Sequence, residues 1–208
     1  MGRWTLRLAG LLGFLLLLAG QPAKAQIIYT FVDTGTGTIG STPFTNSPFT
    51  ITLVGNPNSI TLNTPPCATL SGTCTVFDLV ASSATFTVDG MNGAFTGTVG
   101  IFDNQTFSAL GFERNPPAGA DIMDLGNSAF ATYDLSTAIG PIGPFSFSPA
   151  QFNCTFGCVG TTLGDLSMSA VSDVTFTAQV VPEPATLLLL GTGAAALAGV
   201  RRKKKVEQ

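Results

Sequence analysis

Apolar and polar residues alternate with a period of two along several segments of this chain, and this feature restricts its fold most. Between residues 174 and 180, one side of an extended chain would carry only apolar residues, namely Val174, Phe176, Ala178 and Val180. Similar alternation recurs at 49–53, 84–89 and 95–101. Because successive side chains of a strand point to opposite faces, each segment predicts a β-strand with one buried face.

Turn residues separate these segments at short intervals. Asp89-Gly90 and Asn92-Gly93 predict a hairpin that joins a strand at 84–89 to a strand at 94–101. Prolines in most of the remainder exclude long helices. We therefore predict an all-β fold, a single antiparallel β-sandwich of jelly-roll or Ig-like type. A closed barrel or a short β-helix is the alternative, although the chain has no fixed repeat that would favour a β-helix.

The first 25 residues have the order of a secretory signal peptide. Two arginines precede an apolar run from Leu8 to Ala19, and Ala23 and Ala25 form a small-x-small cleavage pattern. The run is too short to span a bilayer comfortably, which favours a cleaved signal over an uncleaved anchor. We predict that the secretion machinery exports the chain and that signal peptidase cuts it after Ala25.

The segment from residue 26 to residue 180 is strongly acidic. It contains ten acidic residues and one basic residue, Arg114, although the whole chain has a formal net charge of only −3. A surface of this sign repels phosphate backbones, which argues against nucleic-acid binding. The segment has about 155 residues, enough for one domain with its own core.

An apolar segment near the C-terminus is followed at once by a basic cluster. Residues 185–200 carry no charge, and as a helix they would extend about 24 Å, slightly less than the ~30 Å hydrocarbon core of a bilayer. The basic cluster consists of Arg201, Arg202, Lys203, Lys204 and Lys205. Positive flanks are retained in the cytoplasm, so we predict a short transmembrane helix at 185–200 and a cytoplasmic tail at 201–208. A buried core helix and a disordered tail are the alternatives.

The order of features from 181 to 208 resembles the PEP-CTERM sorting signal of Gram-negative bacteria. Pro182, Glu183 and Pro184 are followed by the short apolar segment and then by the basic cluster. The resemblance implies recognition by exosortase, a membrane transpeptidase-like protease that cuts near the Pro-Glu-Pro motif and removes the helix. The motif is also labelled ice-binding protein C-terminal domain, a label that implies nothing about ice here. The prolines cannot donate backbone hydrogen bonds, which keeps this stretch extended.

The four cysteines form two local pairs, Cys67 with Cys74 and Cys154 with Cys158. Near neighbours are the easiest to join, so in an exported protein we predict these two disulfides among the three possible connectivities. A zinc tetrathiolate is the alternative, disfavoured because the chain has no Cys-x-x-Cys pair and no His.

Candidate sites of other kinds are few. The absence of His, and of Lys between 26 and 180, leaves a carboxylate pair as the familiar catalytic option, either Asp121 with Asp124 or Glu113 near Asp103. Calcium could bind at Asp103-Asn104 or along 121–124, although neither spacing is that of an EF-hand loop. A sugar-binding face usually presents Tyr or Trp. Only Tyr29 and Tyr133 could serve, since the single Trp lies in the signal peptide.

We therefore expect three parts, a signal peptide at 1–25, an exported domain at 26–180 and a sorting signal at 181–208. The predicted protein is non-enzymatic, has no resident cofactor, and is either structural or associated with exopolysaccharide. A glycan- or calcium-binding surface module is the alternative. The resemblance implies a transient inner-membrane anchor followed by the cell surface or the extracellular matrix.

Overall fold

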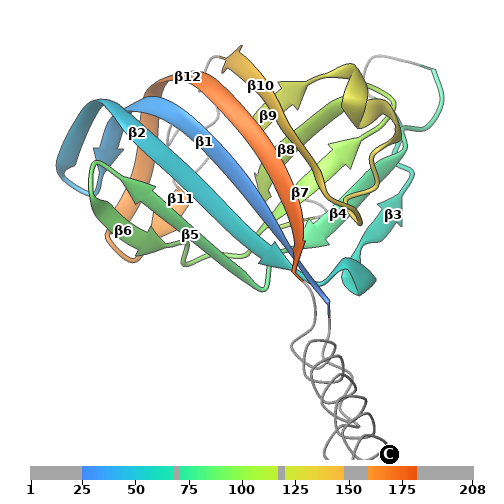
Figure 1. Cartoon of the computed structure of the whole chain (residues 1–208), viewed down its shortest axis with the longest axis horizontal. Helices are drawn as coiled ribbons and strands as arrows, with labels where there is room; N and C mark the ends of the chain where they lie inside the picture. The colour runs from blue at the N-terminus through green and yellow to red at the C-terminus, as the bar shows by residue number, and fades with distance from the viewer. Residues whose placement is uncertain (1–24, 68–70, 117–119, 148–158, 182–208) are drawn as a thin grey trace, which may run out of the picture. The chain divides into compact units, whose positions relative to one another are not determined.

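The structure, a computed structural model, describes residues 25–67, 71–116, 120–147 and 159–181 (Figure 1). These residues are mostly β-strand and form two antiparallel sheets, which confirms the predicted fold class. One compact unit comprises Gln26–Val181. The predicted signal peptide and the predicted helix at 185–200 lie outside the described residues.

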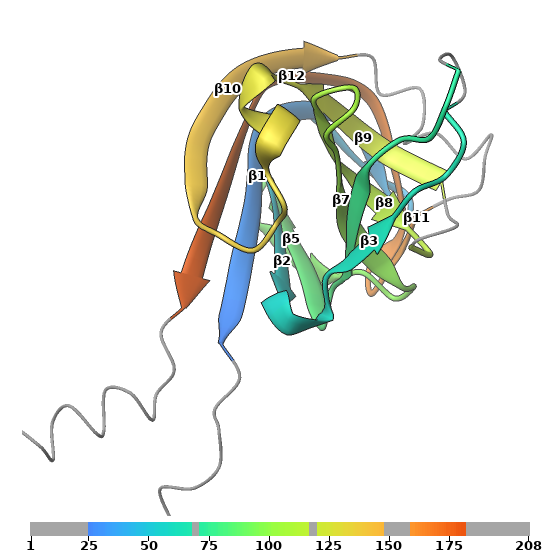
Figure 2. The same cartoon turned by 90° about the vertical axis from the view of Figure 1, so that its right-hand side faces the viewer.

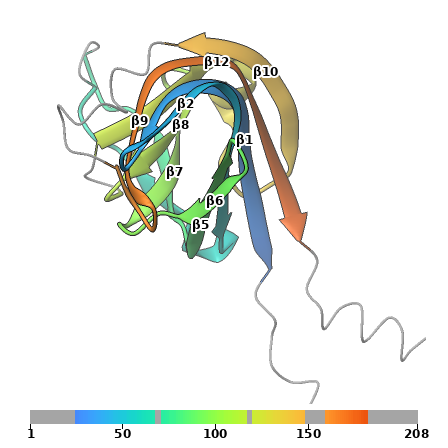
Figure 3. The ribbon, with the colours of Figure 1, turned by 90° about the vertical axis from the view of Figure 1, so that its left-hand side faces the viewer.

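The larger sheet has seven strands and contains both the first and the last strand of the chain. Its order is β10 (Ile139–Phe147), β12 (Gly164–Val181), β1 (Gln26–Ile39), β2 (Thr42–Gly55), β5 (Ser83–Val88) and β6 (Met91–Ala94), and β11 (Val159–Thr161) also pairs with β12. The long strands β1, β2 and β12 arch together (Figure 3). Register shifts between Val32 and Thr34 and between Thr36 and Gly37 interrupt the β1–β12 pairing, as β-bulges do where a strand bends.

The smaller sheet has five strands in the order β3 (Thr61–Asn63), β4 (Val76–Val80), β7 (Val99–Asn104), β8 (Ala109–Arg114) and β9 (Ala120–Gly126). Two short 3₁₀ helices, η1 (Pro57–Ser59) and η2 (Ser128–Thr132), lie in the connections. Figure 2 shows the two sheets facing each other. Buried side chains from both sheets form one hydrophobic core between them.

Aromatic rings fill the centre of this core. Phe176 of β12 is fully buried, and its ring centroid lies 5.1 Å from that of Phe31 and 5.9 Å from that of Phe130. Two tyrosines complete the cluster, with ring centroids 6.4 Å (Tyr29) and 6.5 Å (Tyr133) from Phe176. Phenylalanine therefore serves mainly to fill the core of the described residues.

The predicted alternation of strand β12 is confirmed except at its end. Val174, Phe176 and Ala178 are buried, whereas Val180 is 44% exposed. Strand β10 pairs with β12 only as far as Ala178, so among the described residues no strand pairs with that edge of β12 at Val180. Burial therefore ends where the neighbouring strand ends.

The predicted hairpin is correct at its turn and wrong in its second strand. Asp89 and Gly90, with φ of 47° and 77°, connect β5 to β6 as a two-residue turn. Asn92-Gly93 lies within β6, which ends at Ala94, and the chain then crosses to the other sheet, where β7 begins at Val99. Alternation continued through 95–101 because it records which side of a strand is buried but not which sheet the strand joins.

Candidate functional site

A cleft of about 490 Å³ lies on the outer face of the smaller sheet. The core-facing residues of this sheet include Leu79, Ile101 and Phe112, which lie opposite one another on β4, β7 and β8. The cleft is lined by residues of the other parity on the same strands, by one residue of β9, and by the end of β3 with the two residues that follow it. They are Asn63, Thr64, Pro65, Val76, Asp78, Phe102, Asn104, Glu113 and Asp121.

Two glycines let other groups lie flat against the outer face of the sheet. A Cβ at Gly111 would lie 2.6 Å from the ring of Phe102, and a Cβ at Gly100 would lie 2.7 Å from Cγ of Pro116. Neither glycine can be replaced by a larger residue without displacing these neighbours. Phe102 therefore remains only 6% exposed although it faces away from the core.

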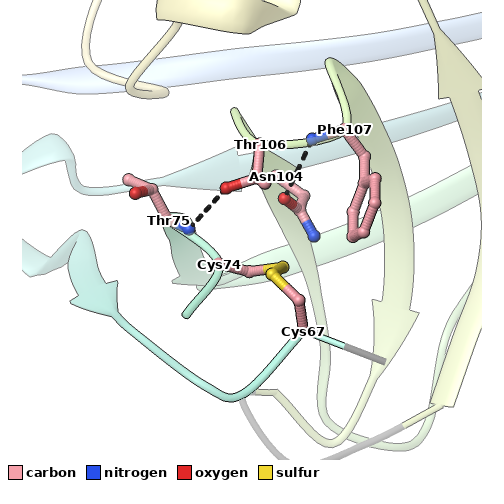
Figure 4. The surroundings of a disulfide bond; sticks show 6 residues. All are labelled: Cys67, Cys74, Thr75, Asn104, Thr106 and Phe107. Carbon is pink, nitrogen blue, oxygen red and sulfur yellow. Dashed lines mark hydrogen bonds between the residues drawn. A yellow bond between two sulfur atoms is a disulfide. The ribbon is translucent and has the colours of Figure 1, made fainter. Parts of the chain in front are cut away.

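One wall of the cleft is connected to a disulfide. Cys67 and Cys74 are joined in the structure, which confirms one of the two predicted pairs (Figure 4). The Cys74 backbone N–H donates to the Pro65 carbonyl at 2.8 Å. The Thr75 N–H donates to Thr106 Oγ1 at 2.9 Å, which ties the loop to the β7–β8 turn. The predicted Cys154–Cys158 pair lies outside the described residues.

Asp78 and Glu113 form a pair of acidic side chains in the cleft. They are 6% and 3% exposed, and Glu113 donates a hydrogen bond to the Asp78 carboxylate. Asn63 also donates to Asp78, through its side-chain amide. Two carboxyl groups this close cannot both ionise easily, so the pair holds a proton at neutral pH.

The electrostatic surroundings of the pair explain why the proton stays. Burial raises the pKa of Glu113, and the negative charges of Asp78 and Asp121 raise it further. Burial also raises the pKa of Asp78, while the hydrogen bonds that it accepts from Asn63 and Glu113 act in the opposite direction. Glu113 Oε1 is buried and has no hydrogen-bond partner. The cleft thus contains an unpaired acceptor next to a shared proton.

Two further buried carboxyl groups lie outside the cleft. Asp103 of β7 is 0% exposed and neither of its oxygens has a partner, and burial together with the charge of Asp134 raises its pKa to about 8. Asp33 of β1 is 5% exposed, and burial raises its pKa to about 8. Both side chains are therefore protonated in the folded protein at neutral pH.

The structure separates the members of two residue pairs that the sequence suggested as candidate sites. Asp103 lies on the core side of β7, whereas Asn104 and Glu113 line the cleft on the outer face. Neighbouring residues of a strand point to opposite faces, so Asp103 and Asn104 cannot share one calcium ion. For the same reason the predicted Glu113–Asp103 pair is wrong.

The other candidate acids, Asp121 and Asp124, both lie on the outer face of β9. Asp121 is paired with Glu113, and Asp124 with Gly111. Residues three positions apart on a regular strand would point to opposite faces. Here a register shift between Phe112 and Glu113 leaves one extra residue on β9, so both acids lie on the same face. Within the ranges that the structure describes, no group of three or more His, Cys, Asp or Glu residues is arranged to hold a metal ion.

The two tyrosines that could have formed a sugar-binding face lie in the core instead. Tyr29 is 0% exposed and its hydroxyl donates to the Leu135 carbonyl at 2.6 Å. Tyr133 is 5% exposed and donates to the Thr137 carbonyl at 2.9 Å. Neither ring can present a surface to a ligand.

Sequence reasoning missed Asp78 and Asn63 as members of the cleft. Asp78 interrupts the apolar run Val76–Val80, and a charged residue inside such a strand is a signal that could have been used. Its partner Glu113 lies two strands away, and that proximity depends on the sheet order β4–β7–β8. Local spacing does not contain this information.

Comparison with known proteins identifies one segment of the chain. Residues 180–203 match the family model of the PEP-CTERM protein-sorting motif, which confirms the resemblance noted in the sequence. The match includes Pro182, Glu183 and Pro184 and extends into the basic cluster. No curated protein and no solved structure matches the chain. Among the described residues, no helix has the length and apolar character needed to cross a membrane.

Proposed function

We propose that this chain is a non-enzymatic protein of the cell envelope or extracellular matrix, with a structural role or an association with exopolysaccharide. The observation that supports this most directly is the PEP-CTERM motif at 180–203. The motif indicates an exported, surface-directed protein and implies an exosortase-type sorting partner. The location in the matrix and the absence of catalysis are the parts that we add.

The processing route has two cuts, each at an end of the folded unit. Signal peptidase cuts after Ala25, and exosortase cuts near Pro182-Glu183-Pro184 after the apolar segment 185–200 has held the precursor in the inner membrane. Strand β1 begins at Gln26 and strand β12 ends at Val181. Both cuts would therefore leave the paired strands β1 and β12 whole, which supports the route.

A non-enzymatic role is supported by the placement of the acids. The chain has no His, the carboxyl groups of Asp103 and Glu113 lie on opposite faces of the smaller sheet, and the Asp78 and Glu113 carboxyl groups in the cleft are engaged with each other in a hydrogen bond. A binding role is the second candidate, and the cleft around Glu113 favours it. A calcium-binding module would instead need further ligands beside Asp121 and Asp124.

The finer architecture that fits this role is a jelly-roll sandwich. The two sheets are its layers, and the first and last strands, β1 and β12, lie side by side in the larger one. The Ig-like order, with the first strand beside the second and the last strand in the opposite sheet, differs from this arrangement.

The test is fractionation of the full chain in a host that has the sorting protease, with detection by antibodies against residues 26–180. The parent should be found as a shortened product in the outer fractions. Replacing Pro182, Glu183 and Pro184 by alanine should leave a product in the membrane fraction with the whole sorting tail. Glu207→Ala, which changes the tail outside the motif, serves as the control. If the triple variant is distributed like the parent, the proposal is wrong.

A further inference from the structure

We propose that the cleft on the outer face of the smaller sheet binds an uncharged saccharide, as a segment of polysaccharide, through hydrogen bonds to Glu113, Asp78 and Asn104. This inference rests on the proposed function for the source of the ligand, because a matrix protein meets polysaccharide. The chemical class of the ligand is inferred from the residues that line the cleft.

The unpaired oxygen of Glu113 is the first observation. Glu113 lines the cleft, is 3% exposed, and its Oε1 has no hydrogen-bond partner. A buried acceptor without a partner is costly, and the great majority of such groups in folded proteins are paired. Because this oxygen is buried, a ligand donor reaches it only when the Glu113 side chain turns towards the cleft, and such a donor would remove this cost. A hydroxyl group is such a donor.

The mixture of groups around Glu113 indicates what kind of ligand fits. Asp78 and Glu113 offer acceptors. Asn104 Oδ1 accepts from the Phe107 N–H at 3.4 Å, so its amide nitrogen supplies donors to the same space. Val76 and Phe102 add apolar surface. A sugar ring presents hydroxyls that donate and accept, together with apolar C–H faces, and therefore matches a lining of this composition.

The lining of the cleft argues against two other ligand classes, anionic polymers and metal ions. The lining contains three acidic residues and no basic residue, so an anionic polymer would be repelled. A metal ion would need several acidic ligands around one point, and the described residues hold no such group of three. The volume, about 490 Å³, lies within the range of about 300–1,000 Å³ usual for small-molecule sites.

The experiment is affinity electrophoresis of the full chain through gels that contain a polysaccharide. The neutral arms contain dextran or a galactomannan, the anionic arm contains alginate, and a further arm contains the polysaccharide of the host's own matrix. Free glucose, added as a competitor to the neutral arms, distinguishes binding of a polymer segment from binding of a single sugar. We expect retardation in at least one neutral arm, none with alginate, and weak competition by glucose.

Two cleft variants and one control decide whether the cleft is responsible. Glu113→Leu removes the hydrogen-bonding oxygens at nearly constant volume, and Thr64→Trp fills the cleft from its exposed wall. Each should weaken the affinity about tenfold or more. Asp89→Asn replaces an exposed acid at the β5–β6 turn, away from the cleft, and should bind like the parent. If Glu113→Leu fails to fold, the result with Thr64→Trp decides.

Three results would overturn the inference. They are retardation by alginate with none in the neutral arms, equal retardation of parent and Thr64→Trp, and no retardation in any arm, including that with the host's polysaccharide. A protein that reaches the matrix in the fractionation experiment but shows one of these results overturns the cleft as a saccharide site and leaves the proposed function standing. A protein that binds saccharide through the cleft but never leaves the membrane overturns the proposed function and leaves the saccharide site standing.

Discussion

The carboxyl groups of Asp78 on β4 and Glu113 on β8 hydrogen-bond to each other across strand β7, which lies between their strands. The β7 residue paired with Glu113 is Gly100, and Cγ of Pro116 lies over it, 2.7 Å from the position that a Cβ would take. Asp78 is paired with Phe102, whose ring lies over Gly111 of β8. Two glycines in the middle of the sheet thus leave room for the rings of Phe102 and Pro116 on the outer face, beside the pair of acids.

The stability of the folded domain should fall as the pH rises from about 4 to about 8. Asp33 and Asp103 have folded pKa values of about 8, against an ordinary value of about 4 in the unfolded chain. Between these values the folded state holds protons that the unfolded state releases. The contribution of these two carboxyl groups to the free energy of unfolding is therefore fully present below pH 4 and is lost as the pH rises through 8. Urea unfolding of the full chain at pH 5 and pH 9 measures this.

The variant Asp103→Asn should make that pH dependence shallower, because the amide cannot ionise in the core. Asp173→Asn changes an exposed acid and should leave the difference between pH 5 and pH 9 as in the parent. A parent protein that is equally stable, or more stable, at pH 9 would show that the buried carboxyl groups are not protonated in the folded state.

Adding a methyl group at Gly111 should destabilise the domain by about 1–3 kcal/mol, the usual cost of overpacking. A Cβ there would meet the Met123 carbonyl and the Phe102 ring. Gly97→Ala is the matched control, since nothing lies within 4 Å of its added Cβ. That substitution should be neutral or stabilise by up to about 1 kcal/mol, because it restricts the unfolded chain. Equal thermal shifts for the two variants would contradict the packing described for the outer face.

Removing the Cys67–Cys74 disulfide should cost about 2 kcal/mol, near the lower end of the usual range for a disulfide, because the loop that it closes is short. The double variant Cys67→Ser, Cys74→Ser should unfold at a lower denaturant concentration than the parent. Treatment with a reducing agent should shift the parent towards the variant and leave the variant unchanged. If the reducing agent lowers the denaturant midpoint of both proteins equally, the stabilisation does not come from the Cys67–Cys74 disulfide.

Neutralising Arg201, Arg202, Lys203, Lys204 and Lys205 should impair processing in a different way from loss of the Pro-Glu-Pro motif. An apolar segment of 16 residues, 185–200, has little surplus length to hold itself in the bilayer without positive charge on its cytoplasmic side. We expect the variant to be released uncut or held loosely, as measured by its extraction from membranes with alkaline carbonate. A variant that is cut and released like the parent would contradict the role given to these charges.

The sequence predicted the strands well and their partners less well. Alternation at Val174, Phe176 and Ala178 identified a buried face because that face follows from a local period of two. The segment at 95–101 was wrongly placed because a crossing between sheets leaves the alternation unchanged. The pairing of Cys67 with Cys74 was predictable because it is local in the chain.

The cleft could not be predicted, because its geometry depends on contacts between distant parts of the chain. Asp78 and Glu113 are 35 positions apart in the sequence, and they meet only because β7 lies between β4 and β8. The acids that the sequence suggested as a pair, Asp103 and Glu113, lie on opposite faces of the smaller sheet. Sequence spacing therefore located the sorting tail, whose signal is linear, and did not locate a site built across strands.

The measurement that tests the account most directly is the intact mass of the protein recovered from the outer fraction of its host, together with peptide mapping of both ends. The account predicts a product that begins at Gln26, retains strand β12 to Val181, and lacks the apolar segment 185–200 and the basic cluster. Recovery of a product from the outer fraction that still contains Arg201 to Lys205 would contradict the account.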